Sequence, residues 1–471
     1  MSRLLLISCL VLFSAPAFSQ NNVSLNASLK DSLFIRKLAD EILVDGHAYS
    51  NLQNLTKTIG GRLSGSPQFY QAEVWAQQAL HDAGAEKVYL QACMVPHWIR
   101  GGADTAAFTT LENKTLLRTR SLDILALGNS KGTGPQGITA PALLIHSFDE
   151  LQRRKSDVKG KIVFYDYPFN ERYVETFRAY SDAVPYRVTG PSNAARYGAV
   201  GVLVRSMSSS TDNNPHTGAM NYNDSFPQIP AAAVGLKDAD SLAAALGKNA
   251  QVSVYLRTMA QMLPDTLAHN VIGELRGSVF PDQVILIGGH LDSWDPAEGA
   301  QDDGAGCVHA IEVLRVLKAV GYKPRHTIRV VLFANEENGG RGGKKYAEEV
   351  GAKKEKQLFA LESDAGGFTP RCFSFSLPEA KLAAIRPWIR LLQPYGVYEF
   401  TSRGGGADVT PLVAQGFTVG ELVPDSQRYF DYHHSRADVL EKVNKRELEL
   451  GAVSMAALVY LVDKYGFTPS P

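Results

Sequence analysis

The segment at residues 284–317, VILIGGHLDSWDPAEGAQDDGAGCVHAIEVLRVL, constrains the fold more than any other part of the chain. Its apolar start predicts a buried strand, a polar loop follows, and an amphipathic helix is expected to begin near Gly304. Apolar strands followed by helices are typical of parallel sheets, and the loops beyond the carboxyl ends of such strands bind ligands. The segment therefore predicts an α/β fold with a functional loop between strand and helix.

The polar loop concentrates one imidazole and several carboxylates: His290, Asp292, Asp302 and Asp303. Carboxylates crowded together repel one another unless a cation neutralises them, and an imidazole with carboxylates is a ligand set that Zn²⁺ accepts. A solvated acidic loop in which Asp302 caps the helix is the alternative interpretation of this segment alone.

Length and charge limit the class of protein. A chain of 471 residues is longer than one ordinary domain. Because 48 basic residues balance 48 acidic ones, nothing favours nucleic acid or an anionic membrane surface as a partner. Cys93, Cys307 and Cys372 show no metal-ligand spacing, so the cysteines predict neither a metal site nor a disulfide framework.

The amino terminus predicts a secreted or periplasmic protein. Arg3 precedes an apolar run, LLLISCLVLF, and small residues follow, which is typical of a signal peptide spanning residues 1–19. The run is too short for a permanent membrane span, so no membrane insertion is expected after cleavage. An extracellular or lysosomal location is the alternative.

The remaining chain predicts two units. Residues 20–103 and 260–471 alternate strand and helix patterns and form one discontinuous catalytic domain. Residues 104–259 contain short β-rich runs such as KIVFYDY and VSVYLR, and we interpret them as an inserted domain. Because none of these runs carries a clustered His and carboxylate set, the inserted domain is expected to contribute no chemistry of its own.

Acidic residues and a His pair follow further strands of the catalytic domain. Glu336-Glu337 follow TIRVVLFAN, Asp364 follows QLFALES, and His433-His434 come after the last strand. Since the carboxyl ends of parallel strands meet at one edge of the sheet, five side chains should converge there: His290, Asp302, Glu337, Asp364 and His434. A catalytic zinc needs three protein ligands, so five suit two metals that share a carboxylate.

The neighbouring acids need different roles. A metal ligand stays deprotonated, whereas a general base exchanges a proton near neutral pH, so Glu336 and Glu337 should face different partners. Alternate residues of an extended strand point in opposite directions, which would separate them. The carboxylate of Asp292 is placed to accept the second ring N–H of His290, or else caps the loop. Asp303 is expected to hold the turn.

Five motifs make the chain recognisable: GHLDSWD, GAQDDGAG, NEENGG, ESDAGG and YHHSRAD. In order and spacing they resemble the metal-binding segments of the di-zinc aminopeptidase and glutamate carboxypeptidase family. GRLSGS, PHW and SFDELQRR narrow the resemblance to one subfamily. The inserted region, with KGKIVFYDY, GAVGVLVRS and PQIPAAAV, is similar to a protease-associated domain.

The resemblance implies a role for each matching residue. His290 and Asp364 would hold one zinc, Glu337 and His434 would hold the other, and Asp302 would bridge the two. The peptide bond that joins Asp302 to Asp303 is often cis in relatives. Glu336 would be the general base. His433 stands where many relatives have Tyr, and it or a zinc would stabilise the oxyanion; packing alone is the alternative for His433.

The resemblance also implies the fold and the activity. The fold would be a mixed, mostly parallel sheet flanked by helices, as in zinc exopeptidases and phosphorylase/hydrolase-like proteins, with the inserted β-rich domain. The protein would be a homodimeric di-zinc exopeptidase that cleaves dipeptides or small peptides with free termini. Asp408 and Arg403 are candidates for binding substrate, or else structure their loop. An aminopeptidase for longer peptides and a non-catalytic, receptor-like metal-binding protein are the alternatives.

Overall fold

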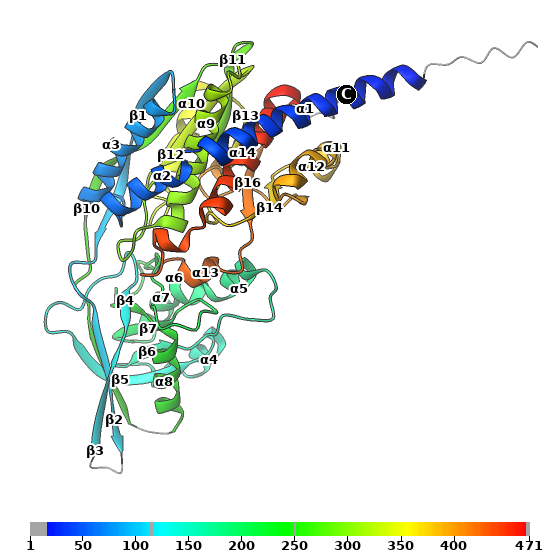
Figure 1. Cartoon of the computed structure of the whole chain (residues 1–471). Coiled ribbons are helices and arrows are strands. Elements are labelled where there is room, and N and C mark those ends of the chain that lie inside the picture. Colours follow the sequence, from blue (N-terminus) through cyan, green and yellow to red (C-terminus); the bar gives the residue numbers. More distant parts are fainter. Residues whose placement is uncertain (1–16, 113–115, 249–250, 468–471) are drawn as a thin grey trace, which may run out of the picture.

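The computed structural model describes residues 17–112, 116–248 and 251–467. The chain forms two units, each built on its own eight-stranded sheet. Figure 1 shows the catalytic unit above and the inserted unit, in cyan and green, below it. The predicted signal peptide lies mostly outside the described residues, and the first described helix begins at Ala17. Among the helices of the described residues, none is both long and apolar enough to cross a membrane.

The catalytic sheet is mixed. Its strands lie in the order β1 (Lys87–Ile99), β10 (Gln261–Leu275), β12 (His326–Phe333), β11 (Phe280–His290), β13 (Lys356–Glu362), β16 (Val419–Pro424), β14 (Pro370–Phe375) and β15 (Glu399–Thr401). The pairs β11–β12, β11–β13, β13–β16 and β14–β15 are parallel. The pairs β1–β10, β10–β12 and β14–β16 are antiparallel. The predicted mixed α/β sheet is confirmed, with parallel strands at its centre.

Helices cover both faces of this sheet because its central strands are apolar on both sides. One face packs in a single core against α1 (Ala17–Asp45), α3 (Pro67–Asp82), α9 (Ala305–Ala319), α11 (Glu379–Ile385), α12 (Ile389–Leu392) and α14 (Lys445–Tyr465). The other face packs against α10 (Arg341–Lys353). The short α2 (Ala48–Asn54) packs beside α9. The strands β14 and β15 were not predicted, because they are short and lack the helix-alternating pattern.

The inserted unit has a second mixed sheet. Its strands lie in the order β3 (Leu116–Leu122), β2 (Thr105–Glu112), β9 (Val252–Arg257), β5 (Ile138–Ile145), β6 (Ile162–Tyr165), β7 (Gly201–Arg205), β8 (Ala231–Val234) and β4 (Ile124–Ala126). Its helices are α4 (Phe148–Arg153), α5 (Thr176–Ala183), α6 (Pro185–Val188), α7 (Gly190–Ala195) and α8 (Leu236–Gly247). Its core also takes in Tyr429 and Phe430 from α13 (Tyr429–Tyr432) of the catalytic unit. The two units are therefore packed together at α13.

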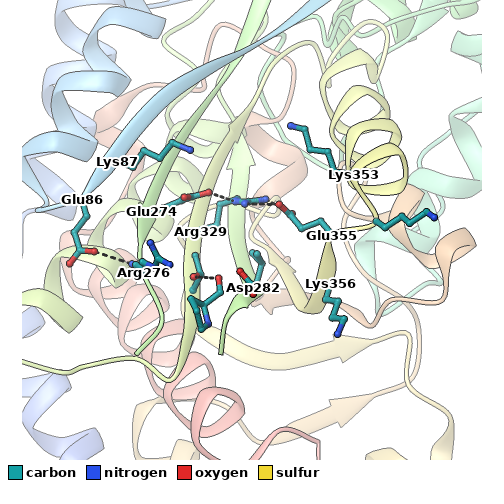
Figure 2. Close-up of a pocket in the computed structure, with 13 residues that line it drawn as sticks. Glu86, Lys87, Glu274, Arg276, Asp282, Arg329, Lys353, Glu355 and Lys356 are labelled. Carbon is teal, nitrogen blue, oxygen red and sulfur yellow. Dashed lines mark hydrogen bonds and ion pairs between the residues drawn. The ribbon is translucent and has the colours of Figure 1, made fainter. Parts of the chain in front are cut away.

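A charged cavity of about 740 Å³ lies at the amino ends of the central strands, near Val284, Thr327 and Lys356 (Figure 2). Its floor is the guanidinium of Arg329, which is mostly buried and bonded to Glu274, Glu355 and Tyr346. Every described bond of this guanidinium goes to another protein side chain, so the network ties β10, β12 and β13 together. The predicted site lies at the opposite, carboxyl edge of the same strands.

Candidate active site

The five predicted ligands converge at the carboxyl edge of the catalytic sheet. His290 is the last residue of β11, Asp364 follows β13, and Asp302 lies in the turn before α9. The Nε2 atom of His290 lies 3.2 Å from Oδ1 of Asp302 and 3.1 Å from Oδ1 of Asp364. These three side chains form one candidate cation site.

A second donor group lies on the other side of Asp302. The Nε2 atom of His434 lies 3.1 Å from Oε2 of Glu337 and 3.4 Å from Oδ2 of Asp302. His433 also comes within reach, with Nε2 3.8 Å from the same Asp302 oxygen. The two oxygens of one carboxylate thus face two separate donor groups, which is the arrangement predicted for Asp302.

The donor spacing fits a tetrahedral metal. Bonds of about 2.0–2.1 Å to His and carboxylate ligands place neighbouring donors about 3.3–3.4 Å apart. The four separations above, from His290 and His434 to their carboxylate partners, are 3.1–3.4 Å. In addition, Oε1 of Glu337 is buried without a hydrogen-bond partner among the described residues. Both observations are satisfied by a cation at each position.

Burial excludes the alternative of a solvated acidic loop. The exposed fractions of Asp292, Asp302 and Asp303 are 0%, 5% and 0%. Burial, followed by the charge of Asp302, raises the pKa of Glu337 well above its usual range. Burial also acts to raise the pKa of Asp302, but His290 and His434 outweigh it and lower that pKa. Acids held this far from water without a countercharge are costly, so the cluster favours a cation.

The imidazole of His434 is suited to bind a metal. Burial lowers the pKa of His434 to about 3, so the ring is neutral at pH 7 and keeps a lone pair on one nitrogen. Nε2 is the nitrogen that faces the carboxylates, so the ring proton belongs on Nδ1.

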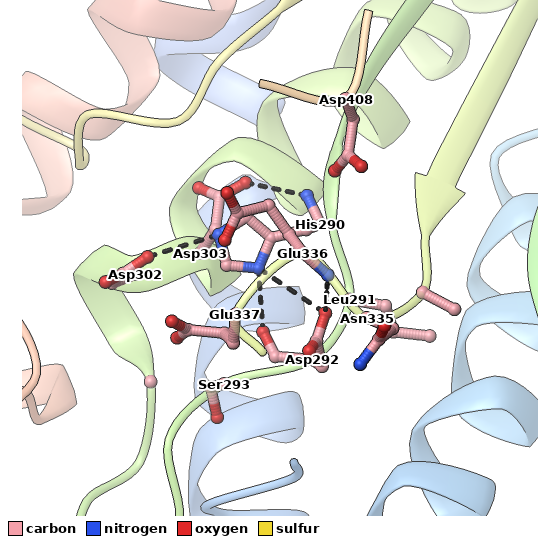
Figure 3. Close-up of polar contacts among 12 residues, drawn as sticks. His290, Leu291, Asp292, Ser293, Asp302, Asp303, Asn335, Glu336, Glu337 and Asp408 are labelled. Atoms are coloured by element: carbon pink, nitrogen blue, oxygen red, sulfur yellow. Dashed lines mark hydrogen bonds and ion pairs between the residues drawn. The ribbon is translucent and has the colours of Figure 1, made fainter. Parts of the chain in front are cut away.

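Glu336 lies beside the donor groups, in a turn rather than at a strand end as predicted. Strand β12 ends at Phe333, and Asn335 then takes a positive φ of 62°, which starts the turn that separates Glu336 from Glu337. Figure 3 shows the two carboxylates directed to different places. Burial, with the charges of neighbouring acids, raises the pKa of Glu336 to about 8. A carboxyl group with such a pKa can exchange a proton near neutral pH.

The orientation of His290 differs from the prediction in one respect. Its Nδ1 lies 3.0 Å from the backbone carbonyl oxygen of Asp292, whereas the Asp292 carboxylate is 3.7 Å away. That carboxylate instead accepts the backbone N–H of Glu336 at 3.1 Å (Figure 3). Asp303 accepts the backbone N–H groups of His290 and Gly306, so it holds the turn as expected. The peptide bond between Asp302 and Asp303 is cis.

The predicted substrate-binding residues differ in position. Asp408 is buried, and its Oδ2 has no hydrogen-bond partner among the described residues. Burial, then Glu362 and Glu336, raise its pKa, so Asp408 belongs electrostatically to the site. Arg403, in contrast, has a 65% exposed side chain and pairs through both terminal nitrogens with Glu175. For Arg403 the pair with Glu175 favours the alternative role, structuring its loop, over binding of substrate.

Two supporting residues were missed. Arg62, fully buried, donates to the carbonyls of Leu291, Glu298 and Gly299 in the loop between His290 and Asp302. Asp438 accepts the backbone N–H groups of residues 301 and 302, at 2.7 and 3.1 Å. Both lie in segments that carry the family resemblance, GRLSGS and YHHSRAD, and that was the signal available.

The fold and the paired donor groups together are typical of metal-dependent hydrolases of the α/β class. Residues 270–459 match the model of Peptidase family M28. Carboxypeptidase Q of Homo sapiens is 36% identical over 88% of this chain and 85% of its own length, and that of Xenopus laevis is 34% identical over 93% and 90%. The chain belongs to peptidase family M28, and the predicted subfamily resemblance, to carboxypeptidase Q, is confirmed.

Solved structures agree with this placement. A peptidase M28 precursor from Shewanella amazonensis SB2B has 32% identity and a TM-score of 0.88, over 94% of this chain and 99% of the other. BSAP, a zinc aminopeptidase from Bacillus subtilis, has a TM-score of 0.63 over 88% and 94%, and at 20% identity it shows the fold alone. The predicted class of metallopeptidase is thereby confirmed at the level of the family.

Proposed function

We propose that this protein is a di-zinc exopeptidase that hydrolyses dipeptides or small peptides with free termini. One observation carries the proposal: the two oxygens of Asp302 face two donor groups, His290 with Asp364 and Glu337 with His434. Each group with Asp302 provides three ligands, the number that a catalytic zinc takes from protein. When bound, the zinc ions supply Lewis acidity and lower the pKa of water.

Glu336 acts as the general base. It accepts a proton from the attacking water and returns it to the nitrogen of the leaving amine, which a carboxyl group can do when its pKa is near the working pH. The backbone N–H of Glu336 donates to the carboxylate of Asp292. The backbone carbonyl of Asp292 also orients the ring of His290. The base and one ligand therefore share a support, which fixes their separation.

His433 stabilises the oxyanion. Burial and neighbouring positive groups hold its pKa well below the usual range, so the ring is neutral and can donate one N–H. The ring stacks on His434 with centroids 3.5 Å apart and packs against Tyr180, Tyr429 and Phe430. A fixed donor beside the reacting carbonyl is the requirement for this role.

Asp408 receives the free amino terminus of the substrate. The unpaired, buried Oδ2 of this residue supports the role, because a buried carboxylate gains most from a cationic partner. A requirement for a free amino group would limit the enzyme to exopeptidase chemistry. Arg403 has no part in this proposal.

The location, domain organisation and oligomeric state that we propose are those expected from the sequence. The leader at residues 1–19 supports a secreted or periplasmic protein. We further propose that residues 104–259 are a protease-associated domain and that the enzyme is a homodimer.

The test is hydrolysis of dipeptides with free and acetylated amino termini by the mature protein, with zinc counted. We expect two zinc ions per chain and cleavage of free dipeptides. Glu336→Gln should keep the metal and lose activity by about 10²–10⁴-fold, whereas Glu348→Gln, an exposed control on α10, should match the wild type.

Each outcome of that test has a separate meaning. Equal cleavage of acetylated and free peptides would remove the role of Asp408. Faster cleavage of long peptides than of dipeptides would favour the aminopeptidase alternative. Bound zinc without any cleavage would refute the peptidase proposal and leave a non-catalytic metal-binding protein.

A further inference from the structure

We propose that the inserted unit helps to form the metal site, because its turn at residues 216–218 positions the side chain of His434 from outside the catalytic unit. The inference rests on the proposed function, since it concerns a ligand of the proposed zinc pair. It replaces the expectation that residues 104–259 contribute nothing to the chemistry.

Thr217 holds His434 at two points. The backbone N–H of Thr217 donates to the carbonyl oxygen of His434 at 2.8 Å. The carbonyl oxygen of Thr217 lies 3.3 Å from Nδ1 of His434. Because Nε2 of the ring faces Glu337 and Asp302, Nδ1 carries the proton, and this N–H donates a hydrogen bond to the Thr217 carbonyl oxygen. The contact therefore fixes both the tautomer and the tilt of the ring.

The backbone contact has its own importance. His434 has a φ of 58°, in the left-handed region, which costs a residue other than glycine of order 1 kcal/mol or more. The hydrogen bond from Thr217 to the His434 carbonyl helps to hold this conformation. Without it, the ring would lose the backbone geometry that aims Nε2 at the carboxylates.

Arg187 holds the Thr217 carbonyl in place. Its Nη1 donates to that carbonyl oxygen at 3.3 Å, and its Nη2 donates to the hydroxyl of Tyr180 at 2.6 Å. Arg187 is buried on α6, and Tyr180, on α5, packs edge-on against His433. The support thus runs from the inserted unit to both His residues after α13, and Figure 1 shows α13 beside α5 and α6.

Gly218 makes the close approach possible. A Cβ atom at this position would lie 2.6 Å from Nδ1 of His434 and 2.5 Å from Cζ of Arg187, and φ is +126°. The turn is anchored in its own unit: Gly218 accepts the N–H of Gly128, and the Thr217 hydroxyl donates to the carbonyl of Ala126. The turn is therefore anchored within the inserted unit, and it meets the catalytic unit at His434.

The inserted unit supports one metal position more than the other. Asn129 and Asn338 exchange hydrogen bonds at 3.2 Å in both directions, and Asn338 directly follows Glu337. His434 and the residue next to Glu337 thus contact the inserted unit. His290, at the other position, is oriented by Asp292 and Asp303 of the catalytic unit. Loosening the inserted turn should weaken one zinc and spare the other.

The test is zinc affinity of the full chain, measured by chelator competition, for Gly218→Ala beside Gly160→Ala. The control glycine also has a positive φ, +74°, in the inserted unit, but a Cβ there meets nothing within 4 Å. For Gly218→Ala we expect one zinc bound as in the wild type and one weakened on the order of 10–100-fold, the usual effect of losing an outer partner of a ligand. Gly160→Ala should bind both as the wild type does.

A second variant guards against misfolding of Gly218→Ala. Arg187→Met removes the support of the Thr217 carbonyl, together with the Nη1 atom that lies 3.5 Å from Nδ1 of His434, without inserting an atom there. It should weaken the same zinc. Cobalt substitution provides an independent reading, because the absorption of only one of two bound ions should change. Unchanged affinities in Arg187→Met, or equal weakening of both ions, would overturn the inference. A wild-type chain that binds no zinc would refute the proposed function instead.

Discussion

Arg62 gives a quantitative test of how the ligand-bearing loop is held. Its guanidinium is fully buried, and its described hydrogen bonds all go to backbone carbonyls. Three lie in the loop, at 2.6, 2.8 and 3.0 Å: Leu291, Glu298 and Gly299. Arg62→Met leaves the carbonyls of Leu291 and Glu298 without a described donor, at about 1–3 kcal/mol each, whereas the Gly299 carbonyl keeps the N–H of Gly304. The desolvation cost of the lost cation is recovered in part, so we expect a net loss of about 2–4 kcal/mol.

Urea unfolding of the metal-free protein at pH 7, followed by tryptophan fluorescence, measures this loss directly. An unchanged slope against urea would show that the native state, not the denatured state, has changed. Arg62→Lys keeps the charge, but one ammonium does not span three carbonyls, so it should recover only part of the stability. Added zinc should raise the free energy of unfolding of both variants, but each should remain less stable than the wild type. A loss below about 1 kcal/mol for Arg62→Met would refute this account of the loop.

Three further predictions follow from buried charges. Arg329→Met should cost about 3–5 kcal/mol in thermal unfolding but leave kcat unchanged, since the Arg329 network lies at the far edge of the sheet; Lys356→Met, at the rim of the same cavity, should change neither. Asp438→Asn should lower zinc affinity by about 10–100-fold in chelator competition, because the amides around the bridging carboxylate lose an acceptor. Burial acts to raise the pKa of Asp463, but hydrogen bonds from a His ring, a Tyr hydroxyl and backbone amides lower it, so its stabilisation is complete above the unfolded pKa of about 4 and lost below it. The deficit of Asp463→Asn in urea unfolding should therefore shrink as pH falls through this range.

The convergence of the candidate ligands could be predicted because their positions are encoded locally. His290 ends an apolar strand, and Glu337 and Asp364 follow apolar strands within a few residues. Parallel strands bring such positions to one edge of the sheet. The strands themselves are continuous apolar runs, which predict burial on both faces. Local pattern and topology therefore suffice for convergence of the donors.

Contacts made by backbone atoms are harder to predict. The carboxylate of Asp292 has the right chemistry to orient His290, and the prediction chose it for that reason. In the structure the Asp292 carbonyl takes that place, and the carboxylate bonds to the amide of Glu336, 44 residues away. The contact of Arg403 could not be predicted for a similar reason, since its partner Glu175 lies 228 residues earlier in another unit. Side-chain identity gives the chemistry that is possible, and the fold decides which partner is in reach.

The contact between Thr217 and His434 is the limiting case. The groups of Thr217 that meet His434 are its amide and its carbonyl, which nearly every residue type has. Because this contact does not depend on the side chain at residue 217, no sequence motif could predict it. The requirement falls on its neighbour instead, because a side chain at Gly218 would meet both His434 and Arg187. A glycine far from His434 in sequence is therefore a trace that this contact leaves in the chain, beside Arg187, which bonds to the Thr217 carbonyl.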